Sequence, residues 1–122
     1  MKKLNSLILI SFLIFLASCG GINCTQLPKT YSSYKEAIKT VESAHFKIQE
    51  TINTSKSSWI QQASYYSCDG KVGFFIFKTH SRKYIYSGVP VTVWEGFKKA
   101  RSFGSYYDHY IKHKYYFRLN KP

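Results

Sequence analysis

An uncharged apolar run near the start of the chain, residues 7–16, decides how much of the sequence enters the folded domain. It follows the cationic start Met1-Lys2-Lys3. A run of about ten residues fits the core of a signal peptide, whereas a span across a bilayer takes roughly twenty. With residues 1–18 assigned to a signal peptide, about a hundred residues remain, which is enough for one domain with a single modest core.

The four residues that end this run, Leu16-Ala17-Ser18-Cys19, resemble the signal of bacterial lipoproteins. Small residues fit the peptidase subsite before the cut, and the thiol of Cys19 is the group that receives diacylglycerol. Two or three acyl chains anchor a protein stably, because each buried methylene contributes about 0.8 kcal/mol. The motif predicts a lipid-anchored protein of the bacterial cell envelope, and Gly20 favours the outer membrane over the inner one. The alternative is an ordinary secretory leader with a chance cysteine.

Two further cysteines, Cys24 and Cys68, remain if Cys19 carries lipid. In an oxidising compartment they can form a disulfide that closes a loop of about 45 residues and stabilises the fold by up to roughly 4 kcal/mol. The alternative is a free thiol at Cys24, in a tether over residues 19–32, and a small buried side chain at Cys68. The sequence leaves both alternatives open.

The segment that begins at Ser33 has the spacing of an amphipathic helix. Ser33 and Glu36 match a capping box, and apolar side chains then recur at helical intervals as far as Ile52. We therefore expect a helix over residues 33–53, with His45 at the edge of the core.

After residue 53 the apolar spacing changes to a period of two. It predicts strands over residues 59–67, 73–79 and 83–87, with a hairpin at Asp69-Gly70. Pro90 suits the start of a helix that turns Trp94 and Phe97 toward the sheet. A second short helix over residues 106–113 and an extended piece over residues 115–119 follow.

These elements predict an α+β fold. It consists of an N-terminal amphipathic helix, a three-stranded antiparallel meander, two short helices and a C-terminal strand, with the helices on one face of the sheet.

A series of short motifs in this half of the chain resembles the KTSC domain. That domain is about sixty residues long and is named for its occurrence at the C-terminus of some lysyl-tRNA synthetases. The resemblance covers residues 57–119. It implies a stand-alone accessory module with no established activity, for which RNA binding has been suggested. The matching motifs are Ser57-Ser58-Trp59-Ile60, Tyr84-Ile85-Tyr86, Gly88-Val89-Pro90, Val93-Trp94, Phe97, Ala100, Ser102-Phe103-Gly104-Ser105-Tyr106 and Ile111-Lys112.

The hallmark of this resemblance is the Tyr-x-Tyr motif of Tyr84 and Tyr86, which share one face of a strand while Ile85 points to the other. One interpretation is a stacking platform for bases or sugar rings, where stacking contributes about 1–3 kcal/mol per base. The other is that both rings cover the helix that starts at Pro90, at the edge of the core. We favour packing, because one face of the sheet needs helix cover.

The second half of the chain is strongly basic. Residues 71–122 hold eleven lysines and arginines against Glu95 and Asp108, a net charge of +9. Such a field attracts anionic lipid headgroups, acidic polysaccharide, extracellular nucleic acid or an acidic protein, although the charge can also simply keep the surface solvated. Nucleic acid is the least favoured partner in this compartment. Tyr106, Tyr107 and Tyr110 are interleaved with the cations that we expect to bind the anion, which are Lys98, Lys99, Arg101, Lys112, Lys114 and Arg118.

Two histidines, His109 and His113, are spaced to share one face of a helix. A zinc site needs further ligands at fixed spacing, and no such pattern accompanies this pair. We therefore expect no metal, no cofactor and no enzymatic activity. A small hydrolase that uses these two histidines is the alternative from another functional class, and a structural protein that braces an envelope complex is a third.

Overall fold

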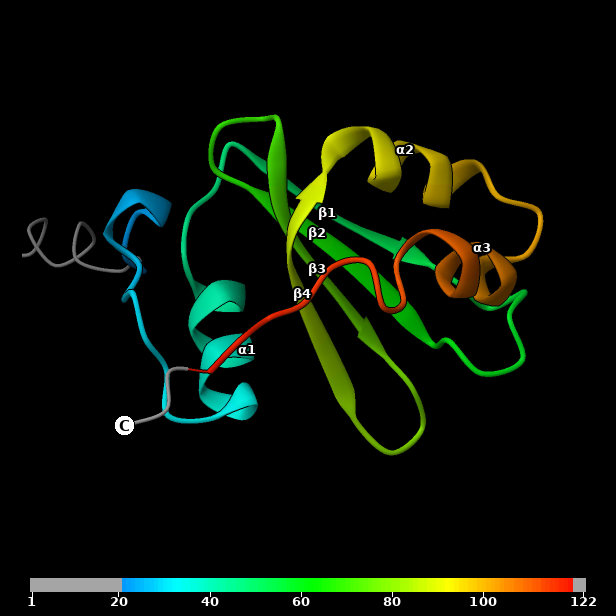
Figure 1. The fold of residues 1–122 in the computed structure, drawn as a ribbon, viewed down its shortest axis with the longest axis horizontal. Helices are drawn as coiled ribbons and strands as arrows, with labels where there is room; N and C mark the ends of the chain where they lie inside the picture. The colour runs from blue at the N-terminus through cyan, green and yellow to red at the C-terminus, as the bar shows by residue number, and fades with distance from the viewer. Residues whose placement is uncertain (1–20, 120–122) are drawn as a thin grey trace, which may run out of the picture.

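The computed structural model describes residues 21–119, and Cys19 lies outside the described residues. Four strands form one antiparallel sheet in the order β1-β2-β3-β4, and each strand pairs with the next one along the chain (Figure 1). The elements are η2 (Cys24–Gln26), α1 (Tyr34–Ser43), β1 (Ile48–Asn53), β2 (Gln62–Ser67), β3 (Val72–Lys78), β4 (Lys83–Pro90), α2 (Val91–Lys99) and α3 (Phe103–Tyr110).

Helices cover both faces of the sheet, so the expectation that all helices share one face is wrong. Helices α2 and α3 pack on the face that carries Tyr65, Phe75 and Phe77. Helix α1 packs on the opposite face, against Ile76 and Ile85 (Figure 1). The alternation of strand side chains supplies an aromatic or aliphatic surface on each face, and each surface needs its own cover.

The predicted helix over residues 33–53 is also wrong in its second half. Helix α1 ends at Ser43, and the sheet gains a fourth strand because residues 48–53 form β1. Ile48, Glu50 and Ile52 are the half-buried positions of that strand, spaced two apart. His45 lies exposed between the two elements, where its carbonyl oxygen accepts from the backbone N–H of Cys24 at 2.9 Å.

The start of α1 confirms one half of the capping box. The hydroxyl oxygen of Ser33 accepts from the backbone N–H of Glu36 at 3.1 Å. The carboxylate of Glu36 accepts from the hydroxyl of Ser32 in place of the backbone of Ser33.

The hairpin predicted at Asp69-Gly70 connects β2 to β3. A carboxylate oxygen of Asp69 accepts from the backbone N–H groups of Lys71 and Val72 at 2.8 and 3.1 Å, and Gly70 has φ 79°. β2 begins at Gln62, later than expected, and β4 continues to Pro90.

The two C-terminal helices differ in how well the sequence predicted them. Pro90 immediately precedes α2, and both Trp94 and Phe97 are fully buried, as expected. α3 starts at Phe103, three residues before the expected start, because the hydroxyl of Ser102 caps it. The expected C-terminal strand is wrong, since residues 115–119 form no strand.

Residues 115–119 instead run from the end of α3 toward α1, as the red part of the ribbon in Figure 1 shows. The hydroxyl of Ser87 in β4 donates to the carbonyl oxygen of Tyr116 at 2.9 Å. The ring of Phe117 packs against Tyr31 and Tyr34, with centroids 5.6 and 6.1 Å apart. This C-terminal segment therefore lies between β4 and α1.

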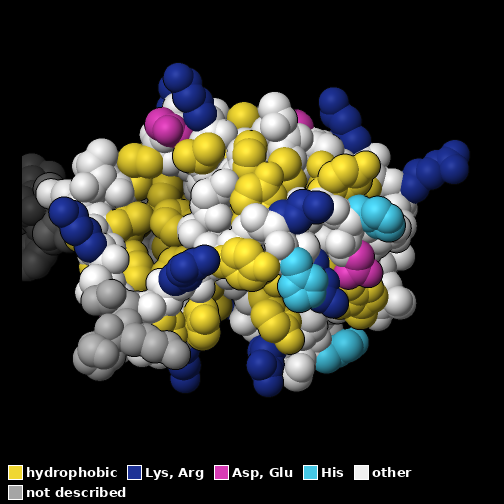
Figure 2. Space-filling view, viewed as in Figure 1, with side chains coloured by type: hydrophobic (Ala, Val, Ile, Leu, Met, Phe, Trp, Pro, Cys, Tyr) yellow, Lys and Arg dark blue, Asp and Glu magenta, His cyan; other side chains and the backbone are white. Residues whose placement is uncertain are grey.

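The basic residues do not gather in one patch on the face drawn in Figure 2. Lysine and arginine side chains are distributed over that face, and hydrophobic side chains are exposed between them. A site for an anion therefore depends on where cations meet a hollow in the surface, and net charge alone does not locate it.

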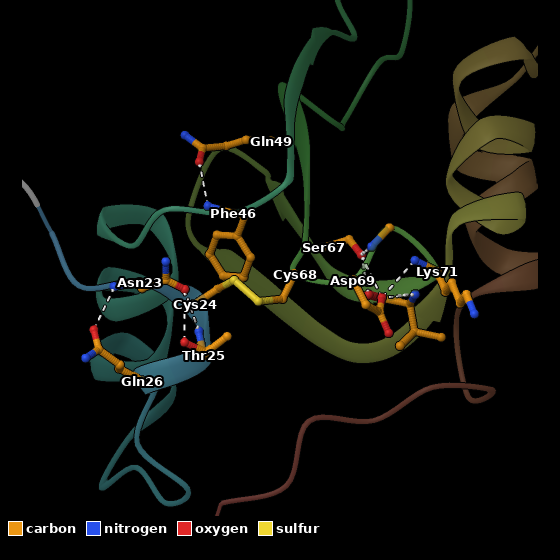
Figure 3. Close-up of a disulfide and its surroundings, with 12 residues drawn as sticks. Asn23, Cys24, Thr25, Gln26, Phe46, Gln49, Ser67, Cys68, Asp69 and Lys71 are labelled. Carbon is orange, nitrogen blue, oxygen red and sulfur yellow. Dashed lines mark hydrogen bonds between the residues drawn. A yellow bond between two sulfur atoms is a disulfide. The ribbon is translucent and has the colours of Figure 1, made fainter.

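A disulfide joins Cys24 to Cys68, with Cα atoms 5.8 Å apart (Figure 3). It links η2 to the start of the β2–β3 turn, beside the ring of Phe46. The backbone bridge between Asn23 and His45 lies next to it. The segment before α1 is thus held on the sheet. Within residues 21–119 the structure contains no helix long and apolar enough to cross a membrane.

Candidate functional site

Tyr86, the second tyrosine of the Tyr-x-Tyr motif, packs at the edge of the core. Its half-buried ring is nearly parallel to that of Phe77, with centroids 6.2 Å apart, and its hydroxyl forms a hydrogen bond with the hydroxyl of Tyr107. Burial raises the pKa of both Tyr86 and Tyr107 above the ordinary value for tyrosine. Tyr86 therefore packs against the core, as the packing interpretation of the motif predicts.

Tyr84, the first tyrosine of the motif, keeps a free surface. Its ring stacks on Phe77 at 5.0 Å on one side, and 36% of the residue is exposed. The guanidinium of Arg82 lies 5.8 Å from the centroid of the same ring. Tyr84 therefore offers a ring beside a cation, which is the arrangement that the binding interpretation requires.

A hollow of about 400 Å³ lies against β4, and we call it the edge groove. Tyr84 and Tyr86 line it from one face of the strand and Ile85 from the other, so the groove follows the free edge of β4 itself. The residues that define the edge groove are Tyr34, Arg82, Lys83, Tyr84, Ile85, Tyr86, Tyr116 and Phe117.

The outer wall of the edge groove comes from α1 and the C-terminal segment. Tyr34 begins α1 and is 51% exposed, and Tyr116 is 54% exposed. Two further hollows also contain Tyr34: one adds Lys35 beside Arg82, and the other adds Arg118 beside Tyr116. The three hollows adjoin at Tyr34, and we call them together the depression; three exposed tyrosines line it.

The lining of this depression is positively charged. It contains Lys35, Arg82, Lys83 and Arg118, and none of its lining residues carries a carboxylate. Lys83 is paired with Glu42 of α1 at 2.9 Å, an exposed pair of the kind that contributes about 0–1 kcal/mol. In the described part of the chain the other three cations have no carboxylate within ion-pair distance.

The structure separates the six cations that the sequence analysis grouped. Lys98 is paired with Glu50 at 2.9 Å and with Glu95 at 3.3 Å, so two carboxylates already engage its ammonium group. The hydrogen bond from Trp94 and the one from Lys98 hold the pKa of the Glu50 carboxyl below its ordinary value. Among the six, Arg118 lines the depression at the edge groove. The others are exposed outside it: Lys99, Arg101, Lys112 and Lys114.

The tyrosines interleaved with these cations mostly pack. Tyr107 is buried, and the hydroxyl of Tyr106 donates to the carbonyl oxygen of Val93 at 3.0 Å. Tyr110 is exposed and rests against the ring of Tyr106.

The two histidines do not form the pair that the hydrolase alternative needs. His109 lies in α3, with Nδ1 3.1 Å from the carbonyl oxygen of Ser105. His113 follows the end of that helix and has φ 62°, so the two do not share a helix face. In residues 21–119 the structure brings together no group of three metal-ligating side chains.

Sequence reasoning missed five residues of the edge groove, which are Tyr34, Arg82, Lys83, Tyr116 and Phe117. Arg82 was assigned to a turn, Tyr34 to the start of a helix, and Tyr116 to a strand. The available signal was the position of Arg82 just before β4 and two residues from Tyr84, where its guanidinium can approach the ring of Tyr84. Nothing local in the sequence predicts that Tyr34 and Tyr116 lie opposite.

Comparison with known proteins supports the family resemblance. Residues 56–115 match the KTSC domain model. The crystal structure of the KTSC domain protein YPO2434 from Yersinia pestis is similar, with 28% sequence identity and a TM-score of 0.47. The similarity covers 61% of this chain and 100% of that one. A search of curated proteins gave no match. Tyr34 and Tyr116 of the edge groove lie outside the matched residues, whereas Arg82 and Tyr84 lie inside them.

Proposed function

We propose that this chain, whose residues 56–115 match the KTSC domain, is a lipid-anchored protein of the bacterial cell envelope that binds an anionic partner without catalysing a reaction. The observation that carries the proposal is the edge groove. Three exposed tyrosines and four cations line the groove and the hollows that adjoin it, and no carboxylate is among the lining residues.

The proposed location rests on two features. Leu16-Ala17-Ser18-Cys19 has the order of residues that lipoprotein processing requires. The disulfide between Cys24 and Cys68 suits an oxidising compartment, because thiols are kept reduced in the cytoplasm. Incorporation of labelled palmitate in cells, and its loss in a Cys19→Ser variant, tests the anchor. Equal labelling of both proteins contradicts it.

The proposed binding rests on the chemistry of the groove walls. Tyrosine and arginine are enriched at binding surfaces, because their rings and guanidinium planes bury large areas with few rotatable bonds. Tyr34, Tyr84 and Tyr116 remain exposed although most large apolar side chains of the chain are buried or partly buried. The neighbouring cations favour an anionic partner and raise its rate of association.

A matched pair of charge reversals tests the site. We expect Arg82→Glu with Arg118→Glu to lower the salt concentration that elutes the Cys19→Ser protein from a heparin column. Lys99→Glu with Lys112→Glu changes the net charge equally at exposed positions outside the groove, and we expect a smaller effect. Equal effects of the two double variants mean that the groove is not the site. Elution at low salt of the Cys19→Ser protein without any charge reversal means that the partner is not anionic.

A further inference from the structure

We propose that the edge groove takes an extended acidic segment of a partner protein, which adds to the sheet as a new strand along β4. This inference rests on the proposed function, because it assumes that the groove is the site of an anionic partner. It adds the chemical class of that partner and the way it is held.

The first argument is that β4 is an edge strand with unused backbone groups. In the described chain β4 pairs with β3 alone. The N–H of Thr79 donates to the carbonyl of Arg82 at 2.9 Å, so these two residues form a hydrogen-bonded pair. The next pair, Lys78 with Lys83, is then not hydrogen-bonded, and the one after it, Phe77 with Tyr84, is hydrogen-bonded again. Hydrogen-bonded pairs alternate in antiparallel ladders, and therefore Lys83 and Ile85 direct their N–H and C=O groups away from β3.

The second argument is that the groove lies where those backbone groups point. Side chains from both faces of β4 line it, so its floor is the edge of the strand. The C-terminal segment approaches β4 through the side chain of Ser87, which donates to Tyr116, and does not pair with the strand. A slot remains between the edge at Lys83–Tyr86 and the outer wall of Tyr34, Tyr116 and Phe117.

The third argument is that cations flank both faces of this slot. Arg82 lies beside the ring of Tyr84, while Lys35 and Lys83 lie toward α1, where Lys83 is paired with Glu42 and Lys35 has no carboxylate within ion-pair distance in the described residues. In strand addition the backbone bonds provide affinity, and the side chains, which alternate between the two faces, provide specificity. An added strand with acidic side chains would meet a cation on either face and tyrosine rings between them.

The same charges argue against a second copy of this chain as the occupant. Pairing two β4 edges would place Arg82 and Lys83 of both copies on one short ribbon, and no carboxylate among the groove residues would offset their repulsion. The edge therefore resists self-association while it remains open to an acidic strand.

The test uses the Cys19→Ser protein and a fluorescent peptide of about eight residues in which pairs of glutamates alternate with pairs of valines, so that an extended strand carries glutamate on both faces. We expect binding that shifts the fluorescence anisotropy. The same peptide with methylated backbone nitrogens keeps its charge and side chains but loses its backbone donors, and we expect it to bind at least about tenfold more weakly. The same peptide with lysine in place of each glutamate is the control for charge and should not bind.

Two variants at one position separate backbone pairing from charge on the protein side. Lys83→Ala removes the side-chain charge and the pair with Glu42. Lys83→Pro removes the same charge and ion pair and also removes the outward backbone N–H. An edge strand tolerates proline at a position whose N–H points away from the sheet. We expect the proline variant to bind the glutamate peptide at least severalfold more weakly than the alanine variant. Circular dichroism identifies a proline variant that fails to fold, in which case the methylated peptide decides alone.

The outcomes distinguish this inference from the proposed function. Equal binding of the methylated and unmethylated peptides overturns strand addition and leaves anion binding intact. Retention on heparin without binding of either peptide also overturns it and favours a polysaccharide partner. Loss of both heparin retention and peptide binding overturns the proposed function itself. Concentration-dependent dimerisation that Arg82→Glu changes would identify a second copy as the occupant.

Discussion

Removing the disulfide should destabilise this protein substantially, and the size of the effect follows from chain entropy. The two cysteines are 44 residues apart in sequence, so the bond prevents the unfolded chain from separating the ends of a long loop. For a loop of this length the chain-entropy model gives about 4 kcal/mol. Both cysteines are only half-buried, so a change to alanine removes little packing in addition.

The assay is urea unfolding of the Cys24→Ala/Cys68→Ala double variant beside the parent protein, followed by tryptophan fluorescence. Trp94 is fully buried and reports on the α2 face of the sheet. We expect the free energy of unfolding to fall by about 3–4 kcal/mol. A reductant should lower the stability of the parent to a similar level and leave the double variant unchanged. A difference below about 1 kcal/mol, or a double variant that responds to reductant, would refute the reasoning.

This magnitude bears on where the protein can function. Domains of this size are stable by about 5–15 kcal/mol, so the loss of the disulfide would remove a large share of that stability. Expression in a reducing cytoplasm should therefore yield a less stable protein than export to an oxidising compartment. Comparison of protease resistance between the two preparations tests this link to the proposed location.

Three further predictions follow from individual contacts. Tyr31→Phe should raise the free energy of unfolding, by up to about 1 kcal/mol in urea titrations, because the buried hydroxyl of Tyr31 has no hydrogen-bond partner in the described structure; a loss of 1 kcal/mol would contradict this. Gly73→Ala should destabilise the fold by at least about 2 kcal/mol, because its Cβ would overlap the carbonyl oxygen of Tyr66; Gly88→Ala meets no atom and should cost only the roughly 1 kcal/mol of a side chain at φ 70°. Burial raises the pKa of Tyr65 from 10.0 to about 12. The protonated side chain therefore contributes fully to the free energy of unfolding below pH 10, and this contribution is lost as the pH rises from 10 to about 12. Thermal midpoints between pH 9 and 12 should then fall less steeply in Tyr65→Phe than in the parent, and parallel curves would show that other groups control the alkaline transition.

The elements that the sequence predicted best are those with local signals. Asp69-Gly70 marks its hairpin because the aspartate accepts from two backbone N–H groups and the glycine takes a positive φ. Pro90 marks the start of α2, and the spacing of Trp94 and Phe97 indicates its buried face. Each of these signals is contained within a few residues, so tertiary contacts are not needed to interpret it.

The error over residues 44–53 shows where local signals fail. Val41, His45, Ile48 and Ile52 satisfy helical spacing, and from Ile48 onward the alternation of a strand fits equally well. Pairing with β2 decides between the two, with Ile48 opposite Ser67 and Ile52 opposite Ala63. That information lies in another part of the chain.

This error also affected the prediction of the binding site. The helix predicted over residues 33–53 includes Glu50 and hid its hydrogen bonds with Trp94 and Lys98. Lys98 was therefore grouped with the cations expected to bind an anion. The shared face of Tyr84 and Tyr86 was predicted, but the wall opposite them depends on the path of the C-terminal segment past α1, which no local pattern specifies.

The placement of Tyr34 and Tyr116 has a consequence for how such a module can diversify. Both residues belong to extensions on either side of the matched domain, and they face a strand that belongs to the domain. Changes in the extensions could alter which partner is recognised while the sheet and its core stay the same. A common scaffold could in this way acquire different ligands by exchanging only the pieces at its two ends.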